Sequence, residues 1–318
     1  MSFQFKRAIR EEVGLIVGVA GGTGSGKTFS SLRMAAGISG DKPFAVIDTE
    51  AGRCKHYADK FSFDHGDLHA PFSPEAYTEA ILAADAARYP CIVVDSMSHE
   101  WASEGGVLEM QESELDRMAG NDWQKREQCK MAAWIKPKMA HKKMVQRLLQ
   151  VRAHLILCFR AEEKVDMVRD SKGKMQIVPK VTKTGLDGWV PICEKALPFE
   201  LTASFLLTND APGMPKPIKL QEQHRAMFPL DKPINEESGR KITAWASGTG
   251  APAAPTRTAG MTDDEIGALV STLDVKTLPE LKTAFEAAWP KTKGDTVARQ
   301  KLQSNYDTMK AAIQAGTI

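Results

Sequence analysis

The residues with the clearest chemical signature form the run Gly-Gly-Thr-Gly-Ser-Gly-Lys-Thr at positions 21–28. The run matches the pattern GxxxxGK[ST], whose glycines let backbone N–H groups curl around phosphate oxygens while Lys27 neutralises their charge. An apolar run precedes the motif and a helical pattern follows it, which is the context that phosphate binding at a helix N-terminus requires. We therefore expect an ATP site, with a ligand-free glycine-rich turn as the alternative. The expected nucleotide-binding residues are Gly21, Gly22, Thr23, Gly24, Ser25, Gly26, Lys27, Thr28 and Phe29.

A metal ion in such a site needs a carboxylate beside the threonine hydroxyl. Asp95 ends the apolar run Cys-Ile-Val-Val-Asp, and a carboxylate at the end of a buried strand is costly unless it faces a cation. We expect Thr28 and Asp95 to hold Mg²⁺, with Asp95 acting directly or through a water molecule. An aspartate that only caps the next helix is the alternative.

Hydrolysis also needs a carboxylate that activates water. Ser96, which carries no carboxylate, follows Asp95, so the base must come from elsewhere. Glu50 ends the run Phe-Ala-Val-Ile-Asp-Thr-Glu, and we expect it on a strand next to the P-loop strand, aimed at the γ-phosphate. Asp48 is the second choice and Glu100 the third. A glutamate that merely opens a surface loop is the alternative.

Four short apolar runs alternate with longer helical patterns, which is typical of parallel strands covered on both faces. A helix is expected over residues 73–89, with Ser73 as its cap and Pro74 at its first position. Residues 162–181 read as a β-hairpin that turns near 171–173, followed by a further strand pair. These patterns predict an α/β fold with a mostly parallel sheet and antiparallel end strands. The four runs are residues 14–20, 44–50, 91–96 and 154–159.

The chain of 318 residues is long enough for two unequal domains. Residues 247–260 are small and rich in proline and glycine, so they predict a flexible linker between a core, 1–246, and a helical module, 261–318. Thr262 and Glu265 form a capping-box pattern at the start of that module.

The order and spacing of these phrases resemble the RecA-type recombinase core, in which the glutamate after the second strand is the catalytic base. The likeness supports Glu50 over Glu100. A closer resemblance, over residues 3–208, is to phage-encoded ATPases with a RecA core that are associated with single-strand DNA annealing and recombination. It implies a RecA-like P-loop fold, ATP and Mg²⁺ as ligands, and single-stranded DNA as a partner.

Arg160 follows the fourth apolar run, where RecA-type relatives often carry a polar amide. It is a third catalytic candidate beside Lys27 and Glu50, because an arginine there can sense the γ-phosphate of its own or a neighbouring subunit. An arginine that only caps a strand end is the alternative. The resemblance also extends to Phe5 and Ala8, which match a Phe-x-x-Ala subunit-linking peptide, with packing on the protein's own core as the alternative. We expect self-association into a ring or filament.

Nine basic side chains lie between residues 121 and 152, opposed only by Asp122 and Glu127, which makes a local charge of +7. Trp123 and Trp134 are interleaved with them, and aromatic faces beside cations suit single-stranded DNA. A solvated helix face with both tryptophans in the core is the alternative. The candidate DNA-binding residues are Lys125, Arg126, Lys130, Lys136, Lys138, Lys142, Lys143 and Arg147.

The cysteine content and the absence of targeting patterns bear on where the protein acts. Five scattered cysteines without a CxxC pair give no disulfide framework or zinc site, and no segment has signal-peptide or membrane-span character. We expect a cytoplasmic protein, in the host cell if it is phage-encoded, with a single-strand-binding protein as a further partner and no membrane role. The leading function is an ATPase acting on single-stranded DNA. A nucleotide-gated assembly or adaptor ATPase that does not bind DNA is the alternative, and a small-molecule kinase is less attractive.

Overall fold

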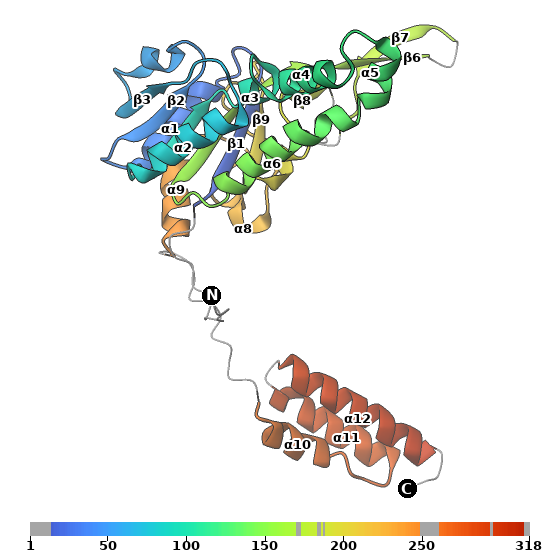
Figure 1. Cartoon of the computed structure of the whole chain (residues 1–318). Helices are drawn as coiled ribbons and strands as arrows, with labels where there is room; N and C mark the ends of the chain where they lie inside the picture. Colours follow the sequence, from blue (N-terminus) through green and yellow to red (C-terminus); the bar gives the residue numbers. More distant parts are fainter. Residues whose placement is uncertain are drawn as a thin grey trace, which may run out of the picture. The chain divides into compact units, whose positions relative to one another are not determined.

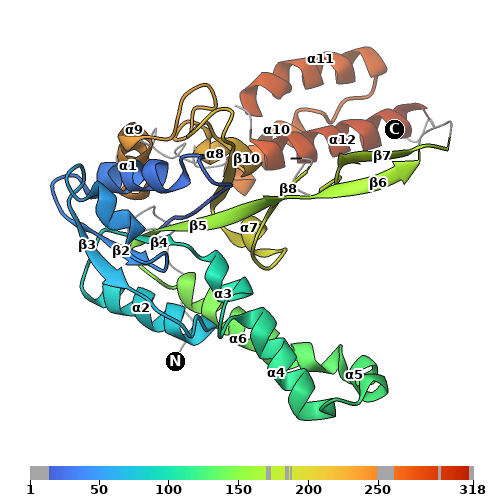
Figure 2. The same cartoon turned by 90° about the horizontal axis from the view of Figure 1, so that it is seen from above.

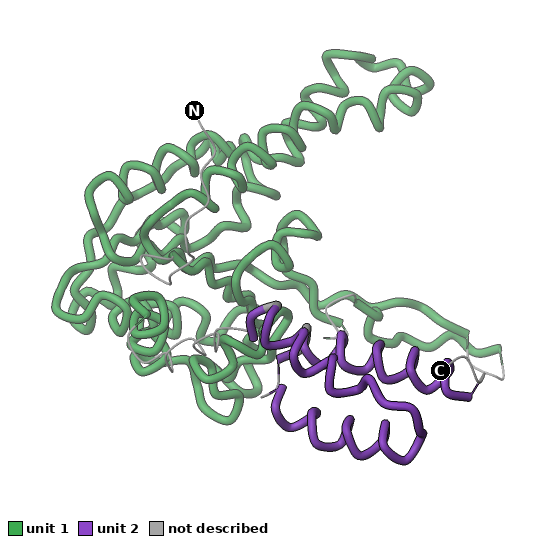
Figure 3. The backbone as a smooth tube through the Cα atoms, turned by 90° about the horizontal axis from the view of Figure 1, so that it is seen from below, with its two compact units in different colours: residues 1–250 green, residues 251–318 purple. Residues whose placement is uncertain are grey.

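The structure is a computed structural model that describes residues 14–169, 173–182, 186, 188–248, 261–292 and 295–314. The chain divides into two compact units, residues 1–250 and 251–318, each with its own hydrophobic core (Figure 1, Figure 3). Most of the expected linker, 249–260, and the Phe5 to Ala8 peptide lie outside the described residues.

The first unit is built on an eight-stranded sheet in the order β10-β9-β1-β5-β4-β2-β3, with β8 paired to the far end of β5. All neighbours are parallel except β8 and β10, which are antiparallel to β5 and β9. The predicted α/β class is therefore confirmed, and each of the four apolar runs forms a strand. The strands are β1 Ile16–Gly21, β2 Phe44–Asp48, β3 Phe63–Asp67, β4 Cys91–Asp95, β5 His154–Glu163, β8 Trp189–Pro191, β9 Ala203–Leu207 and β10 Lys216–Lys219.

The strand order corrects one expectation. β2, which leads to Glu50, pairs with β3 and β4, and two strands separate it from the P-loop strand β1. The neighbour of β1 on this side is β5. The physical reason lies in composition, because Leu155 to Phe159 are all buried and suit the centre, whereas β3 (Phe-Asp-His-Gly-Asp) is partly exposed and suits an edge.

Helices cover both faces of this sheet (Figure 1). On one face α1 packs against β1 and α9, with Leu32, Met34 and Ile242 in a common core. On the other face α2 and α6 bury Tyr77 and Met144 against the sheet. The predicted cap of α2 is confirmed, since the Ser73 hydroxyl accepts a hydrogen bond from the Ala76 N–H. These helices are α1 Lys27–Ser39, α2 Pro74–Ala86, α6 Ile135–Leu148 and α9 Glu236–Ala246.

The close packing of α1 on α9 depends on two glycines. A Cβ atom at Gly37 would overlap the Glu236 carbonyl oxygen, and one at Gly239 would overlap the Met34 carbonyl oxygen. Only glycine lets the two helix backbones approach this closely. The remaining helices of this unit are shorter or lie at its edge: α3 Ser98–Ala102, α4 Val107–Ala119, α5 Trp123–Cys129, α7 Leu197–Glu200 and α8 Glu222–Arg225, with 3-10 turns η1 Arg53–Tyr57 and η2 Ala132–Trp134.

Two projections leave the sheet in different directions (Figure 2). One is the helical arm, residues 107–148, in which α4, α5 and η2 project from the sheet and α6 leads back to pack on it. The other is the predicted hairpin, in which β6 Val165–Arg169 pairs antiparallel with β7 Met175–Pro179. Most of the hairpin's turn, 170–172, lies outside the described residues.

The second unit contains α10 Asp263–Ser271, α11 Leu278–Ala288, η3 Trp289–Thr292 and α12 Thr296–Gln314. The predicted capping box is present, because Thr262 accepts from the Glu265 N–H and the Glu265 side chain accepts from the Thr262 N–H. Leu273, Leu281 and Leu302 form its core. None of the described helices has the length and apolar character needed to cross a bilayer.

Candidate nucleotide site

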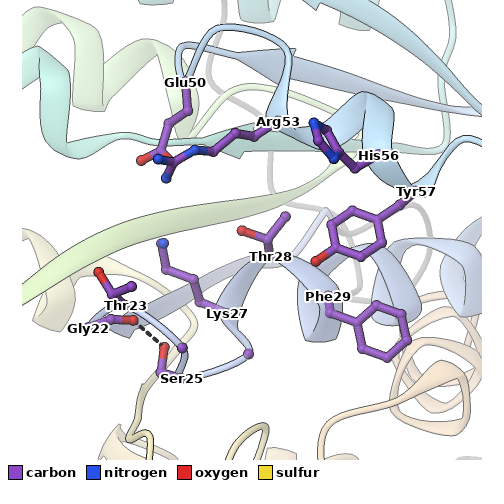
Figure 4. A pocket seen from close by; sticks show the side chains of 12 residues that line it. Gly22, Thr23, Ser25, Lys27, Thr28, Phe29, Glu50, Arg53, His56 and Tyr57 are labelled. Atoms are coloured by element: carbon purple, nitrogen blue, oxygen red, sulfur yellow. Dashed lines mark hydrogen bonds and ion pairs between the residues drawn. The ribbon is translucent and has the colours of Figure 1, made fainter.

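The predicted P-loop joins β1 to α1 as a tight turn. Gly24 and Gly26 have left-handed φ angles of 79° and 80°, which glycine adopts without strain. The Ser25 hydroxyl donates to the Gly22 carbonyl at 2.8 Å and closes the turn (Figure 4). A Cβ atom at Gly21 would overlap the Ser25 Oγ, so the sequence of this loop is the one that permits its shape. The turn sits at the positive end of the α1 dipole, where anions are stabilised.

Thr28 and Asp95 meet at the base of this turn. The Thr28 hydroxyl donates to Asp95 Oδ2 at 2.5 Å, and Asp95 Oδ1 is buried without a hydrogen-bond partner among the described residues. Burial raises the pKa of Asp95, while Lys27 and the Thr28 hydroxyl lower it. A buried carboxylate oxygen without a partner costs free energy unless a cation is beside it.

The donors present fit Mg²⁺. The ion prefers oxygen ligands and is usually held by one or two protein groups, substrate phosphates and water, with no need for an all-protein cage. A hydroxyl and a carboxylate at the edge of a phosphate loop provide such a set. No cluster of three or more His, Cys, Asp or Glu side chains suited to a metal occurs among the described residues.

A cavity of about 510 Å³ opens over the P-loop (Figure 4). Its volume is in the range of small-molecule sites. The Lys27 side chain points across this space toward Glu50 (Figure 4). Residues 22–29 line one side, and Glu50, Arg53, His56 and Tyr57 line the other.

Glu50 is held between two arginines. Its Oε1 accepts from Arg160 Nε and its Oε2 from Arg53 Nη1, both at 2.9 Å, and only 5% of the side chain is exposed. Burial raises the pKa of Glu50, but the cations Arg160, Lys27 and Arg53 outweigh burial and hold it below its usual range. The carboxylate is therefore ionised and able to accept a proton.

The two other acids considered as bases have structural partners. Asp48 is fully buried and accepts hydrogen bonds from the Glu50 N–H at 2.7 Å and the Cys54 N–H at 2.9 Å, which shapes the loop after β2. Glu100 pairs with His141 and does not line the cavity. Glu50 is thus the acid that faces the P-loop.

Arg160 lies in register with Gly21, on the strand next to β1. The sequence suggested a strand that ends at Phe159, but β5 continues to Glu163, so Arg160 does not cap a strand end. Its side chain is about half exposed and reaches Glu50 of the same chain.

Sequence reasoning missed the residues of η1. Arg53, His56 and Tyr57 line the cavity, and the Tyr57 ring lies 5.6 Å from the Phe29 ring, measured between centroids. Flat aromatic surfaces suit a nucleotide base. The segment carries no periodic pattern, and only its aromatic residue a few positions after Glu50 could have drawn attention.

A P-loop, a buried carboxylate bonded to its threonine and a second carboxylate across the cavity define a P-loop ATPase site. The chain belongs to the family described as AAA domain, whose family model matches residues 14–192. Among solved structures, a KaiC-like protein from the hyperthermophilic archaeon Pyrococcus horikoshii OT3 is similar at 15% identity and a TM-score of 0.30, covering 61% of this chain and 71% of that one. A search of curated proteins found no match.

The helical arm carries the expected DNA-binding residues, and the structure separates them into two groups. Arg126 contacts Glu112 and Asp116, Lys136 contacts Glu114 at 2.9 Å, Lys130 contacts Glu127 and Lys143 lies 3.8 Å from Glu75. In the described part of the chain no acid lies within ion-pair distance of the remaining four. These are Lys125, Lys138, Lys142 and Arg147.

The fold reduces the expected charge surplus, because α4 contributes four acids, and three of them (Glu112, Glu114 and Asp116) contact basic side chains of α5 and α6. Residues 107–152 contain ten basic and six acidic side chains, a surplus of four. Trp123 is 71% exposed, so the alternative that places both tryptophans in the core is wrong. Trp134 is partly buried and stacks on Trp101 with centroids 6.0 Å apart.

Proposed function

We propose that this protein hydrolyses ATP with Mg²⁺ at the P-loop and uses the cycle to bind and release single-stranded DNA in phage recombination or replication. The observation that carries the hydrolysis is the Thr28 to Asp95 hydrogen bond beneath a cavity that Glu50 faces. The DNA role is supported by the resemblance to phage annealing ATPases and by the unpaired cations of the arm. It would act in the cytoplasm of the host and as an oligomer.

The residues divide the work of hydrolysis among themselves. The P-loop amides and Lys27 bind the β- and γ-phosphates, and Thr28 with Asp95 would hold the metal ion. Mg²⁺, when bound, supplies charge neutralisation on the phosphate oxygens. Glu50 accepts a proton from the attacking water at a carboxylate oxygen.

Arg53 and Arg160 make the availability of Glu50 depend on whether a triphosphate is bound. The two oxygens of Glu50 accept from Arg53 and Arg160 respectively. A bound γ-phosphate offers these guanidinium groups a second anionic partner, so a Glu50 oxygen becomes available to water. Glu50 is then free to act as a base only when ATP is bound.

Two substitutions test the hydrolytic assignment. Glu50→Gln should retain ATP binding and lower the turnover rate about 100- to 10,000-fold, because the amide cannot accept the proton. Lys27→Ala should weaken ATP binding as well. Equilibrium binding of ATP and the rate of phosphate release, measured on each variant, distinguish a loss of ATP binding from a loss of turnover. A Glu50→Gln protein with an unchanged turnover rate would remove Glu50 as the base.

The proposed DNA-binding face is the exposed side of residues 131–142, which run from the start of η2 into α6. Met131, Ile135 and Met139 follow one another at four-residue spacing and are 80%, 60% and 65% exposed. Lys138 and Lys142 lie one turn from this stripe, and neither has an acid within ion-pair distance among the described residues, although Lys138 Nζ lies 5.5 Å from the centroid of the Trp134 ring. Apolar surface for bases beside cations for phosphates is the composition that single strands require.

A matched pair of variants tests this face. Lys138→Gln/Lys142→Gln removes two unpaired charges, whereas Arg126→Gln/Lys136→Gln removes two that α4 already neutralises. The first should lower the slope of log affinity against log salt for an oligonucleotide by about 1.4, since each phosphate contact on a single strand contributes about 0.7. The second should change the slope little. Unchanged binding in the first variant would instead favour a nucleotide-gated assembly ATPase that does not bind DNA.

A further inference from the structure

The short helix α3 follows directly after the metal-site strand β4, and its side chains contact different parts of the core. Ser98, His99, Glu100 and Trp101 are consecutive, and each one contacts another element. The first three are at least nine-tenths buried. No step of the proposed hydrolysis uses them.

Two of these contacts reach the nucleotide site. The Ser98 hydroxyl accepts from the backbone N–H of Arg160 at 2.8 Å. His99 Nδ1 lies 2.8 Å from the Thr49 hydroxyl, and that hydroxyl also accepts from the Ser96 N–H at 2.8 Å. Thr49 precedes Glu50 directly, so α3 is tied to Arg160 through the backbone N–H of that residue and to Glu50 through the side chain of the preceding residue, Thr49.

The other two contacts reach the helical arm. Glu100 Oε1 lies 2.9 Å from His141 Nδ1 of α6, with side-chain exposures of 1% and 7%. The Trp101 ring stacks on Trp134 of η2 and meets the His141 ring edge-on at 5.9 Å. α3 and the base of the arm therefore share a buried polar contact inside an aromatic cluster.

A buried pair of this kind is costly to separate. Burial lowers the pKa of His141, but Glu100, aided by Glu194 and Glu200, raises it above its usual range, which favours the protonated ring. If α3 moved away from α6, a carboxylate would remain in an apolar environment without its partner. The two elements therefore move together when either one is displaced.

We propose that α3 couples the nucleotide site to the helical arm through the Glu100 to His141 contact. This inference rests on the proposed ATP site. When the triphosphate draws Arg160 and Arg53 from Glu50, the ends of β2 and β5 shift, α3 follows through Ser98 and His99, and α6 follows through Glu100. The arm thereby changes its affinity for its ligand with nucleotide state.

Hydrogen exchange of the intact protein tests the coupling without assuming a DNA ligand. Exchange of residues 107–148 is compared with and without a non-hydrolysable ATP analogue and Mg²⁺. In the wild type we expect protection in the arm to change when the analogue binds. Glu100→Gln, and Glu100→Gln/His141→Gln, which leaves a neutral amide pair, should keep analogue affinity within about twofold and lose the response of the arm.

A matched control is available on the other face of the sheet. Glu236→Gln breaks the 2.6 Å ion pair with Arg33 between α9 and α1, which does not involve α3 or the arm, and it should keep the full response. As a second readout, the ratio of oligonucleotide Kd values with and without analogue should be on the order of 5 to 150 in the wild type and approach 1 in the Glu100 variants.

The outcomes separate the two proposals. If the analogue binds but exchange of the arm does not change, or if both Glu100 variants keep the wild-type response, the coupling is overturned and the ATP site stands. If the analogue does not bind the wild type, the ATP site itself fails and the coupling fails with it.

Discussion

At the scale of single residues, the pKa values of the two carboxylates of the site, Asp95 and Glu50, are shifted in opposite directions. Burial raises the pKa of Asp95, whose Oδ1 has no hydrogen-bond partner in the part of the chain that the structure describes, whereas arginines and Lys27 lower the pKa of Glu50. Carboxylates whose environments push their pKa values apart commonly have different roles. One is suited to a cation and the other to proton transfer.

His154 gives a residue-scale prediction about pH. Burial lowers its pKa to about 4, and its Nδ1 accepts from the Leu15 N–H at 3.1 Å, which requires an unprotonated nitrogen. As pH falls below about 6.5, the unfolded chain binds a proton that the folded chain does not bind until about pH 4. The stabilisation that depends on the unprotonated His154 ring is therefore complete above pH 6.5. About 3 kcal/mol of the free energy of unfolding is lost once the pH has fallen below about 4.

Denaturant unfolding at pH 7.5 and pH 5, on wild type and His154→Gln, measures the part of this loss that falls above pH 5, about 2 kcal/mol. The glutamine oxygen can accept the same N–H bond but does not titrate. We expect a shallower pH dependence in the variant. Parallel pH dependences would show that His154 contributes nothing.

At the scale of elements, the 3-10 turn η1 is expected to supply the base platform. Tyr57→Ala should weaken ATP binding about tenfold, because stacking on an aromatic ring contributes roughly 1 to 3 kcal/mol per base. Affinity for inorganic triphosphate, which has no base, should not change, and Tyr57→Phe serves as the control. Equal losses for ATP and triphosphate would show that Tyr57 supports the loop instead of contacting the base.

The elements also show what the sequence could and could not predict. The four buried strands, the capped helix α2 and the hairpin follow from local apolar runs and turn residues, and so were predictable. The place of β5 between β1 and β4 was not, because strand order depends on how crossover connections pack.

The residues of the candidate site also fall into those that the sequence could predict and those that it could not. The P-loop, Asp95 and Glu50 stand at the ends of recognisable strands and could be proposed from sequence. Arg53 and Tyr57 enter the cavity through a turn with no periodic signal. The acids of α4 are visible in the sequence, but only the packing of α4 on α5 and α6 shows which lysines and arginines they neutralise.

At the scale of the whole molecule, the central claim is a magnesium-dependent ATP site in a family of P-loop ATPases. The measurement that tests it most directly is calorimetric titration of the intact protein with a non-hydrolysable ATP analogue, with Mg²⁺ and with a chelator. We predict binding that weakens at least tenfold without Mg²⁺ and loses that metal dependence in Asp95→Asn. Absence of binding, or affinity that is the same with and without the metal in wild type, would contradict the account.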